Sequence, residues 1–359
     1  MMKCNVIGAG VNGLILAREL SKLDVPTTVY ERKKGIEPSK SSSGILSASG
    51  LKGLGINVKN IWLNKLYGAN IYFDKTVLHI KSKDLQAYGI DREKLNIQLR
   101  EEAESNGAKI LYGKSISKSE LSNMDGIIAG ADGAVSNVAS HFGFPSIKRF
   151  VLTYRAEYKA KKEDMETVDL FFDNNITKGL FGWIAPHGDD IEIGVGIESK
   201  LGKSTDAFKK FIMKKEVKDL IKDARLIGGG ASIIPIALRE RFAYDEKNVL
   251  LVGDAAGQVK STTGGGIIFG GNAAIIAAKA IHDKINSKTS LESYERNWLK
   301  EFGMEVRLHN LIHSIYSSLS NRQLDYLARL LKALSIEKVL SKYGDMDRPS
   351  LIIKRMLKV

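Results

Sequence analysis

The chain has 359 residues, a net charge of +13, 43% hydrophobic residues and 26% charged residues, a balance typical of a folded globular protein. A single cysteine, Cys4, excludes a disulfide within the chain and favours a reducing compartment, so we expect a cytoplasmic location. The basic excess favours anionic partners. However, the lysines are scattered among acids, and neither metal-ligand spacing nor an aromatic basic stripe predicts a metal or a nucleic acid partner.

The N-terminal elements follow the pattern of a dinucleotide-binding β-α-β unit. The sequence predicts a strand, an amphipathic helix and a second strand over residues 3–8, 11–24 and 25–32. Glycines at G-x-G-x-x-G spacing would form a tight turn, let a pyrophosphate approach the backbone and let the helix pack on the strand; these are Gly8, Gly10 and Gly13. Glu31, about 20 residues further on, favours contact with an unphosphorylated ribose, as in FAD or NAD.

Beyond this unit, the predicted elements no longer repeat the nucleotide-binding pattern. First come two strands around a turn at 74–75, then a helix and a strand within 91–113, and then a strand ending at 132–133. Alternating strands follow over 149–231, with a polar helical stretch at 204–224. A buried strand at 248–254 and a long helix at 264–286 come next, and from residue 290 the sequence predicts only helices.

The stretch NVLLVGDAAGQVKSTTGGGI, residues 248–267, combines a buried strand, a carboxylate and three consecutive glycines. The strand ends at Asp254, and Gly264, Gly265 and Gly266 precede the long helix. Glycine loses the most backbone entropy on folding, so three in a row are costly for a plain helix start. A ligand that contacts the backbone explains them better than a flexible helix entry does.

Five motifs in order carry a resemblance to a known family: GAGVNG with Glu31, DREKLNIQLREEAESNGA, GADGAVSNVA, FGWIAPHGDDIEIGVG and GDAAGQVKSTTGGGI. Together they resemble the p-hydroxybenzoate hydroxylase-like flavoproteins, and most of all the geranylgeranyl reductase family of archaea and plants. The resemblance extends over roughly residues 1–300. It implies bound FAD and saturation of isolated C=C bonds in prenyl chains, as in the archaeal digeranylgeranylglycerophospholipid reductases.

The expected fold class is α/β, with a discontinuous nucleotide-binding domain. The resemblance implies a Rossmann-like FAD-binding domain (1–70, 91–147 and 245–290), an inserted antiparallel β-sheet domain for substrate (71–90 and 148–244) and a C-terminal helical region (291–359). The tail sequence RPSLIIKRMLKV is basic and apolar. It fits either a packed final helix or a peripheral contact with a membrane.

The resemblance also implies which residues contact FAD. Asp254 would bind ribityl or ribose hydroxyls, and the three glycines would bring backbone N–H groups against the flavin ring. Arg92 would reach the cofactor from the start of its helix, although an ordinary charge in a first helical turn explains it as well. The remaining implied contacts are Asn12, Arg32, Ser42, Gly44 and Ile267.

Two motifs concern the substrate rather than the cofactor. FGWIAP resembles the family's aromatic-x-Trp-x-Phe-Pro stretch, so Phe181, Trp183 and Pro186 are the candidate substrate contacts. An aromatic wall suits an apolar chain, and a plain core position is the alternative for Trp183. KSSSG, residues 40–44, stands where the family carries Arg-Cys-Gly-Glu-Gly. Ser41 takes the cysteine position and is the candidate catalytic residue, with a serine-rich loop as the alternative.

The first functional hypothesis is therefore an FAD-dependent reductase of prenyl lipids, reduced by an external donor such as ferredoxin or NAD(P)H. A peripheral membrane contact would accompany a lipid substrate. A flavin monooxygenase or halogenase is the second hypothesis, because GWIAP also resembles the Trp-x-Trp-x-Ile-Pro signature of halogenases, with Phe181 replacing the first tryptophan. A non-catalytic flavin-binding protein is the third.

Overall fold

The computed structural model describes residues 2–37, 41–287 and 289–356. Its first layer is a six-stranded sheet that is parallel except at one edge. In spatial order the strands are β15 (Ala243–Tyr244), β16 (Val249–Leu251), β9 (Ile127–Gly130), β1 (Cys4–Ile7), β2 (Thr27–Glu31) and β8 (Lys109–Tyr112). The strands β1, β9 and β16 are fully buried and, apart from Asn5 in β1, apolar, as expected for the centre of a parallel sheet.

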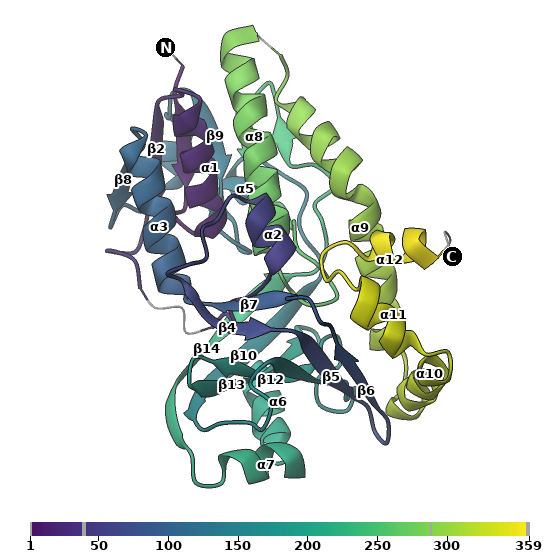
Figure 1. Ribbon diagram of the computed structural model, residues 1–359. Helices are drawn as coiled ribbons and strands as arrows, with labels where there is room; N and C mark the ends of the chain where they lie inside the picture. Colours follow the sequence, from purple (N-terminus) through teal and green to yellow (C-terminus); the bar gives the residue numbers. More distant parts are fainter. Residues whose placement is uncertain (1, 38–40, 288, 357–359) are drawn as a thin grey trace.

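Three helices pack side by side on this sheet, with α1 between the other two (Figure 1). They are α1 (Val11–Lys22), α3 (Arg92–Ser105) and α8 (Ile267–Ser287). The expected β-α-β unit is present, since β1 and β2 run parallel with Cys4 opposite Thr27. Two short helices, α4 (Lys118–Ser122) and α5 (Asn137–His141), flank β9 in the chain.

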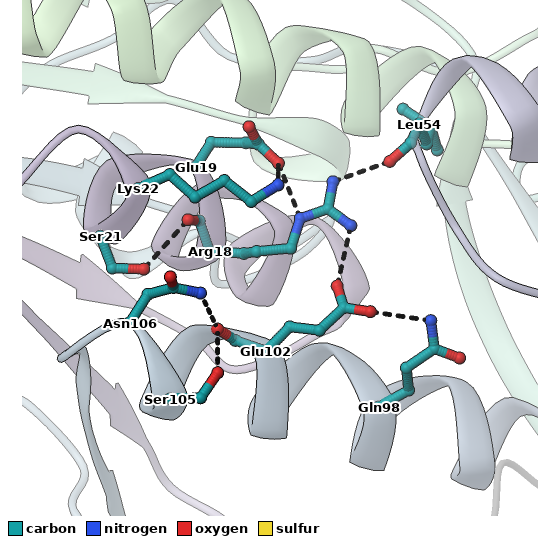
Figure 2. Close-up of polar contacts among 9 residues, drawn as sticks. All are labelled: Arg18, Glu19, Ser21, Lys22, Leu54, Gln98, Glu102, Ser105 and Asn106. Carbon is teal, nitrogen blue, oxygen red and sulfur yellow. Dashed lines mark hydrogen bonds and ion pairs between the residues drawn. The ribbon is translucent and has the colours of Figure 1, made fainter.

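A buried arginine fixes how α1 lies against its neighbours (Figure 2). Arg18 is 2% exposed, and its guanidinium donates to Leu54 O at 2.7 Å and to Glu102 Oε2 at 3.1 Å. A third bond goes to Glu19 Oε1 at 2.7 Å. A buried charge is tolerated only when it is paired and hydrogen-bonded. This network therefore holds α1 to α3 and to the end of α2 (Ala48–Gly53).

The second layer is a seven-stranded sheet. In spatial order its strands are β14 (Arg225–Pro235), β10 (Phe150–Lys159), β13 (Asp190–Glu198), β12 (Gly182–His187), β11 (Thr167–Phe171), β5 (Gly68–Tyr72) and β6 (Val77–Lys81). All neighbours are antiparallel except β11 and β5, which run parallel. The expected antiparallel insert thus contains one parallel pair, because β5 joins the sheet from a distant part of the chain.

One face of this second sheet is covered by α6 (Ser204–Phe211) and α7 (Lys215–Ile221). The polar helical stretch predicted at 204–224 is therefore two helices rather than one. The break lets Phe211 and Val217, both fully buried, enter the same apolar cluster with Ile193 and Val195 of β13.

A small sheet, which the sequence did not predict, connects the two large ones. It pairs β3 (Ile45–Ser47), β7 (Ala87–Ile90) and β4 (Trp62–Leu66) in that order. The expected domain boundary between residues 70 and 71 falls inside β5, so we propose that the boundary lies before Gly68. The division of the chain into domains otherwise stays a prediction from the sequence.

The chain ends in helices, as predicted: α9 (Glu292–Ser318), α10 (Asn321–Ala333), α11 (Ile336–Tyr343) and α12 (Pro349–Met356). The first helix, α9, packs on α8, and α12 packs back on α9, while α11 lies against β6 (Figure 1). α9 buries Tyr294, Trp298 and Phe302 in the main core. Among the residues described, every helix is too short or too polar to cross a lipid bilayer.

Candidate functional site

Each of the three glycines in the loop between β1 and α1 is explained by a different feature of the structure. Gly8 has φ +108°, and a Cβ there would lie 2.4 Å from Ala131 O. A Cβ on Gly13 would lie 2.0 Å from Gly8 O, so only glycine lets α1 approach the loop. Gly10 instead faces open space, with no atom within 4 Å of its Cβ position. Gly10 also caps α1 without any side-chain bond, which leaves the first backbone N–H groups of the helix available to an anion.

Glu31 lies at the end of β2, beside this loop. Its Oε2 accepts from the backbone N–H of Ala9 at 2.8 Å, and its Oε1 accepts from Lys33 N at 2.9 Å. Each carboxylate oxygen has a further lone pair for a ligand hydroxyl. Arg32 follows β2, is exposed and does not line the adjacent cavity.

Two half-buried residues of opposite charge, Asp254 and Arg92, line the same cavity as this loop. Burial raises the pKa of Asp254 to about 6, and the positive charge of Arg92 opposes this rise. Burial also lowers the pKa of Arg92 to about 10. The Arg92 Nη1 donates to Ser42 Oγ at 2.7 Å, whereas its Nε is buried without a partner among the described residues. Arg92 is therefore part of the site and is more than a first-turn charge.

Asn12 has a second buried atom without a partner among the described residues, its Oδ1. Its Nδ2 donates to Gly266 O at 3.4 Å. Buried polar atoms are nearly always hydrogen-bonded in native proteins, so the two orphaned atoms of Asn12 and Arg92 indicate a polar ligand. Together with the open face at Gly10, they fit a bound dinucleotide.

The glycine triplet before α8 is required by close neighbours. Gly264 has φ +71°, which side chains rarely adopt. A Cβ on Gly265 would lie 2.9 Å from Lys260 Cε, and one on Gly266 would lie 2.6 Å from Asp254 Oδ1. Ile267 then begins α8 at the cavity. The glycines keep side chains away from the space in front of this helix N-terminus.

These polar elements form one side of a cavity of about 680 Å³. The opposite side is apolar and is formed by the second sheet and its neighbours: Leu66, Val168, Leu170, Leu180, Phe181, Trp183 and Ile234. Phe181 and Trp183 are 7% and 8% exposed, and their rings meet edge to face. Trp183 is thus both a core residue and part of the cavity wall.

Three residues of the second sheet hold the Trp183 ring. Its Nε1 donates to Glu192 Oε1 at 2.9 Å, and Glu192 Oε2 accepts from Arg155 Nε at 3.0 Å. A Cβ on Gly194 would lie 2.1 Å from the ring, so glycine makes room for it. Pro186 does not line the cavity, because it lies an odd number of residues beyond Trp183 on β12 and therefore faces the other side of the sheet.

The serine loop reaches the same cavity. Ser41, Ser42 and Ser43 are half-buried and line it. Gly44 has φ +69°, and a Cβ there would lie 2.5 Å from Ile90 O, so this glycine closes the loop against β7. Lys40, the first residue of the KSSSG motif, lies outside the described residues.

A cluster around Lys260 was missed by the sequence analysis. Lys260 is 4% exposed, lines the cavity and donates to Asp347 Oδ1 and, at 3.3 Å, to Met346 O. The other oxygen of Asp347 accepts from Ser47 Oγ. His309 Nε2 lies 3.3 Å from Asp347 O, and burial lowers the pKa of His309 to about 4.

This cluster fastens the C-terminal segment over the cavity, whose lining includes Leu340, Gly344, Asp345, Met346 and Ile352. Lys260 and Asp347 are 87 residues apart in sequence, so no local spacing could have predicted the pair. Within the described part of the chain, no cluster of histidine, cysteine and acidic residues could hold a metal ion.

Three archaeal relatives align over nearly the whole chain. A digeranylgeranylglycerophospholipid reductase of Methanocaldococcus jannaschii is 26% identical, covering 91% of this chain and 89% of its own. A digeranylgeranylglycerophospholipid reductase 2 of Methanopyrus kandleri is 27% identical, covering 97% and 96%. An uncharacterized protein of Methanocaldococcus jannaschii is 28% identical, covering 98% and 94%. No protein-family model matches the chain.

Solved structures share the fold. A geranylgeranyl bacteriochlorophyll reductase-like protein from Thermoplasma acidophilum superposes with a TM-score of 0.83 at 18% identity, covering 99% of this chain and 96% of its own. A flavin-dependent brominase triple mutant superposes with a TM-score of 0.72 at 14% identity, covering 100% and 99%. The resemblance to the geranylgeranyl reductase family is therefore confirmed: several archaeal homologues of this chain are named digeranylgeranylglycerophospholipid reductase, and it has the α/β fold expected for the family.

Proposed function

We propose that the protein is an FAD-dependent oxidoreductase that saturates C=C bonds of prenyl (geranylgeranyl) chains in isoprenoid or archaeal ether lipids. One observation carries the proposal: a single cavity joins a glycine-rich polar side, which includes the orphaned buried atoms of Asn12 and Arg92, to an aromatic and aliphatic wall. The names of the archaeal relatives support the same reaction.

The residues around the polar side would hold FAD. Gly10 and the N-terminus of α1 would receive the pyrophosphate, and Glu31 would accept from the ribose hydroxyls. Asp254 would accept from hydroxyls nearer the flavin ring. When bound, FAD supplies the hydride for the alkene. The N-terminus of α8 at Ile267 offers its partial positive charge and backbone N–H groups to the negative edge of a reduced ring.

The apolar wall would bind the prenyl chain. Phe181 and Trp183 bury large surfaces without demanding hydrogen bonds from the ligand, because the Trp183 N–H is already bound to Glu192. The C-terminal segment covers the cavity and limits the access of water, which strengthens electrostatic effects inside it. Ser41, which takes the cysteine position of the family motif, lines the cavity, and its hydroxyl is a much weaker acid than a thiol.

The charge of the chain supports the proposed electron donor and the proposed location. The net charge of +13 suits an acidic donor such as ferredoxin, and it also suits an anionic lipid surface. NAD(P)H is the other candidate donor, although the sequence holds one G-x-G-x-x-G motif and that motif is assigned to FAD. A prenyl lipid substrate and a peripheral membrane contact complete the proposal.

An anaerobic single-turnover experiment tests the proposal. Purified protein is loaded with FAD, reduced with dithionite and mixed with a geranylgeranyl lipid. Reoxidation of the flavin together with a saturated product, detected by mass spectrometry, is expected. Protein that takes up no added FAD would refute the cofactor assignment.

The same experiment distinguishes the reductase from the second candidate function, that of a monooxygenase or halogenase, which the likeness to a brominase favours. Those enzymes need oxygen to form product, so a product that appears only in air would replace the reductase proposal. FAD binding with no reoxidation by any prenyl lipid would favour a non-catalytic flavin-binding protein.

A further inference from the structure

Large apolar side chains are exposed along one side of α10. Tyr326, Leu330 and Leu334 are 64%, 45% and 76% exposed. They are four residues apart, and this spacing places them on one face of the helix. The opposite face is buried through Leu324 and Ala328, at 1% and 0% exposure. The exposed stripe is therefore separate from the surface by which α10 packs on the protein.

The charges of α10 and α11 are sorted in the same way. The structure describes every residue from 321 to 343, and the exposed charged side chains in this stretch are all basic: Arg322, Arg329, Lys332, Lys338 and Lys342. The two acids face the second sheet instead. Asp325 Oδ1 accepts from Lys75 N and Thr76 N, both at 2.8 Å.

The other acid, Glu337, accepts from His79 N at 2.7 Å and is half-buried. Asp325 Oδ2 also pairs with Arg329, so one of the five basic side chains is compensated. The outer side of the pair α10–α11 thus combines apolar side chains with an excess of positive charge. This combination is typical of helices that lie in the interface of an anionic bilayer.

The helices α10 and α11 also lie close to the cavity. α11 follows α10 and packs on β6, and the chain then returns to the body of the protein (Figure 1). Leu340 of α11 and Met346 of the next loop both line the cavity, and Met346 is 36% exposed. The lining of the cavity therefore includes an exposed apolar side chain next to these helices.

We propose that α10 and α11 dock the protein on an anionic lipid bilayer, with Tyr326, Leu330 and Leu334 entering the interface between headgroups and acyl chains. The proposal rests on the proposed function only in that the substrate would be drawn from this bilayer. The last helix of the tail, α12, packs on α9 instead, where Ser350 N donates to Glu305 Oε2 at 3.1 Å.

Two other occupants fit the surface less well. A second copy related by two-fold symmetry would bring the same basic side chains toward each other, which is unfavourable. An acidic protein would satisfy the charge, but Leu334 and Tyr326 project into solvent at 76% and 64% exposure. A deformable bilayer accommodates projecting apolar side chains better than a folded surface does.

Co-sedimentation with vesicles tests the proposal on the full-length protein with FAD bound. The vesicles contain phosphatidylcholine alone or phosphatidylcholine with phosphatidylglycerol, at low and high salt. The protein is expected to bind the anionic vesicles, more weakly at high salt. The double variant Leu330→Glu/Leu334→Glu should bind them roughly tenfold more weakly or worse, since two apolar contacts become repulsive charges.

Val135→Glu is the matched control, because Val135 is 73% exposed and lies between β9 and α5, away from α10. It adds the same kind of charge and should bind vesicles like the wild type. Unaltered FAD content in both variants shows that they fold. Absence of wild-type binding to anionic vesicles, or equal binding by the double variant and the control, would overturn the proposal.

Sedimentation equilibrium without lipid tests whether this surface binds a second copy of the chain instead. A dimer that the double variant abolishes would assign the surface to a second copy and also overturn the proposal. None of these measurements involves turnover. Failure of vesicle binding is thus distinguishable from failure of the proposed reaction.

Discussion

Replacing Asp254 by asparagine should stabilise the FAD-free protein while weakening its hold on FAD. Burial raises the pKa of this carboxyl from 3.8 to about 6. At neutral pH the folded protein therefore holds a charge that its surroundings disfavour, even with Arg92 nearby. The shift of about two pH units corresponds to roughly 3 kcal/mol of lost stability. Asparagine has a similar shape and never ionises, so the variant avoids this cost.

The pH dependence gives the prediction its sign. Between about pH 4 and pH 6 the folded protein binds more protons at Asp254 than the unfolded chain does, so wild-type stability falls as pH rises through this window. The variant should therefore be more stable than the wild type by about 3 kcal/mol at pH 7.5 and by only about 1 kcal/mol at pH 4.5. The lowered pKa of His309 has the opposite effect, a loss of stability on acidification, but both proteins share it and it cancels in the difference.

Urea denaturation of the FAD-free proteins at the two pH values measures this difference. Asp189→Asn, on a side chain that is 99% exposed, is the control and should change stability by less than about 0.5 kcal/mol at either pH. A gain for the Asp254 variant that is the same at both pH values, or no gain, would refute the burial argument. FAD titration completes the test, because the variant should bind FAD more weakly than the wild type.

Three further predictions concern the cavity. Asp347→Ala leaves the Lys260 ammonium buried without its carboxylate, at a cost of about 3–5 kcal/mol in stability. Limited proteolysis should therefore cut the C-terminal segment faster in this variant. An unchanged cleavage pattern would contradict the role of the pair. Ser41→Cys should accelerate alkene reduction by up to about 10²–10⁴-fold while Ser41→Ala changes it little, measured by anaerobic flavin reoxidation. An alanine variant slowed by orders of magnitude would instead make the hydroxyl part of a proton relay. Gly266→Ala places a Cβ 2.6 Å from Asp254 Oδ1 and should weaken FAD binding in a fluorescence titration; equal affinity would show that the glycine is not needed there.

The sequence determined the parts of the protein that depend on neighbours along the chain. The β-α-β unit, its glycine spacing and the acid at the end of β2 all lie within the first 31 residues, and helix and strand periodicity report such local geometry directly. The glycine triplet and Asp254 were found for the same reason. The α/β fold class expected from these motifs is confirmed.

The motifs alone did not predict which of their residues line the cavity. The structure brings Gly10, Ser41, Arg92 and Asp254 around one cavity, although they come from separate parts of the chain. Pro186 matched its motif equally well but faces the other side of the sheet. A motif match fixes the position of a residue on a strand, whereas the packing of that strand decides which of its two faces meets the ligand.

Only the tertiary structure decided which distant segments meet. The parallel pairing of β11 with β5, the small sheet of β3, β7 and β4, and the contact of Asp347 with both Lys260 and Ser47 join residues between about 20 and 300 positions apart. Such contacts leave no periodic trace in the sequence, because each partner satisfies its local pattern whether or not the other is present. They form when the sheets and helices pack and a buried charge such as Lys260 must find an oppositely charged partner.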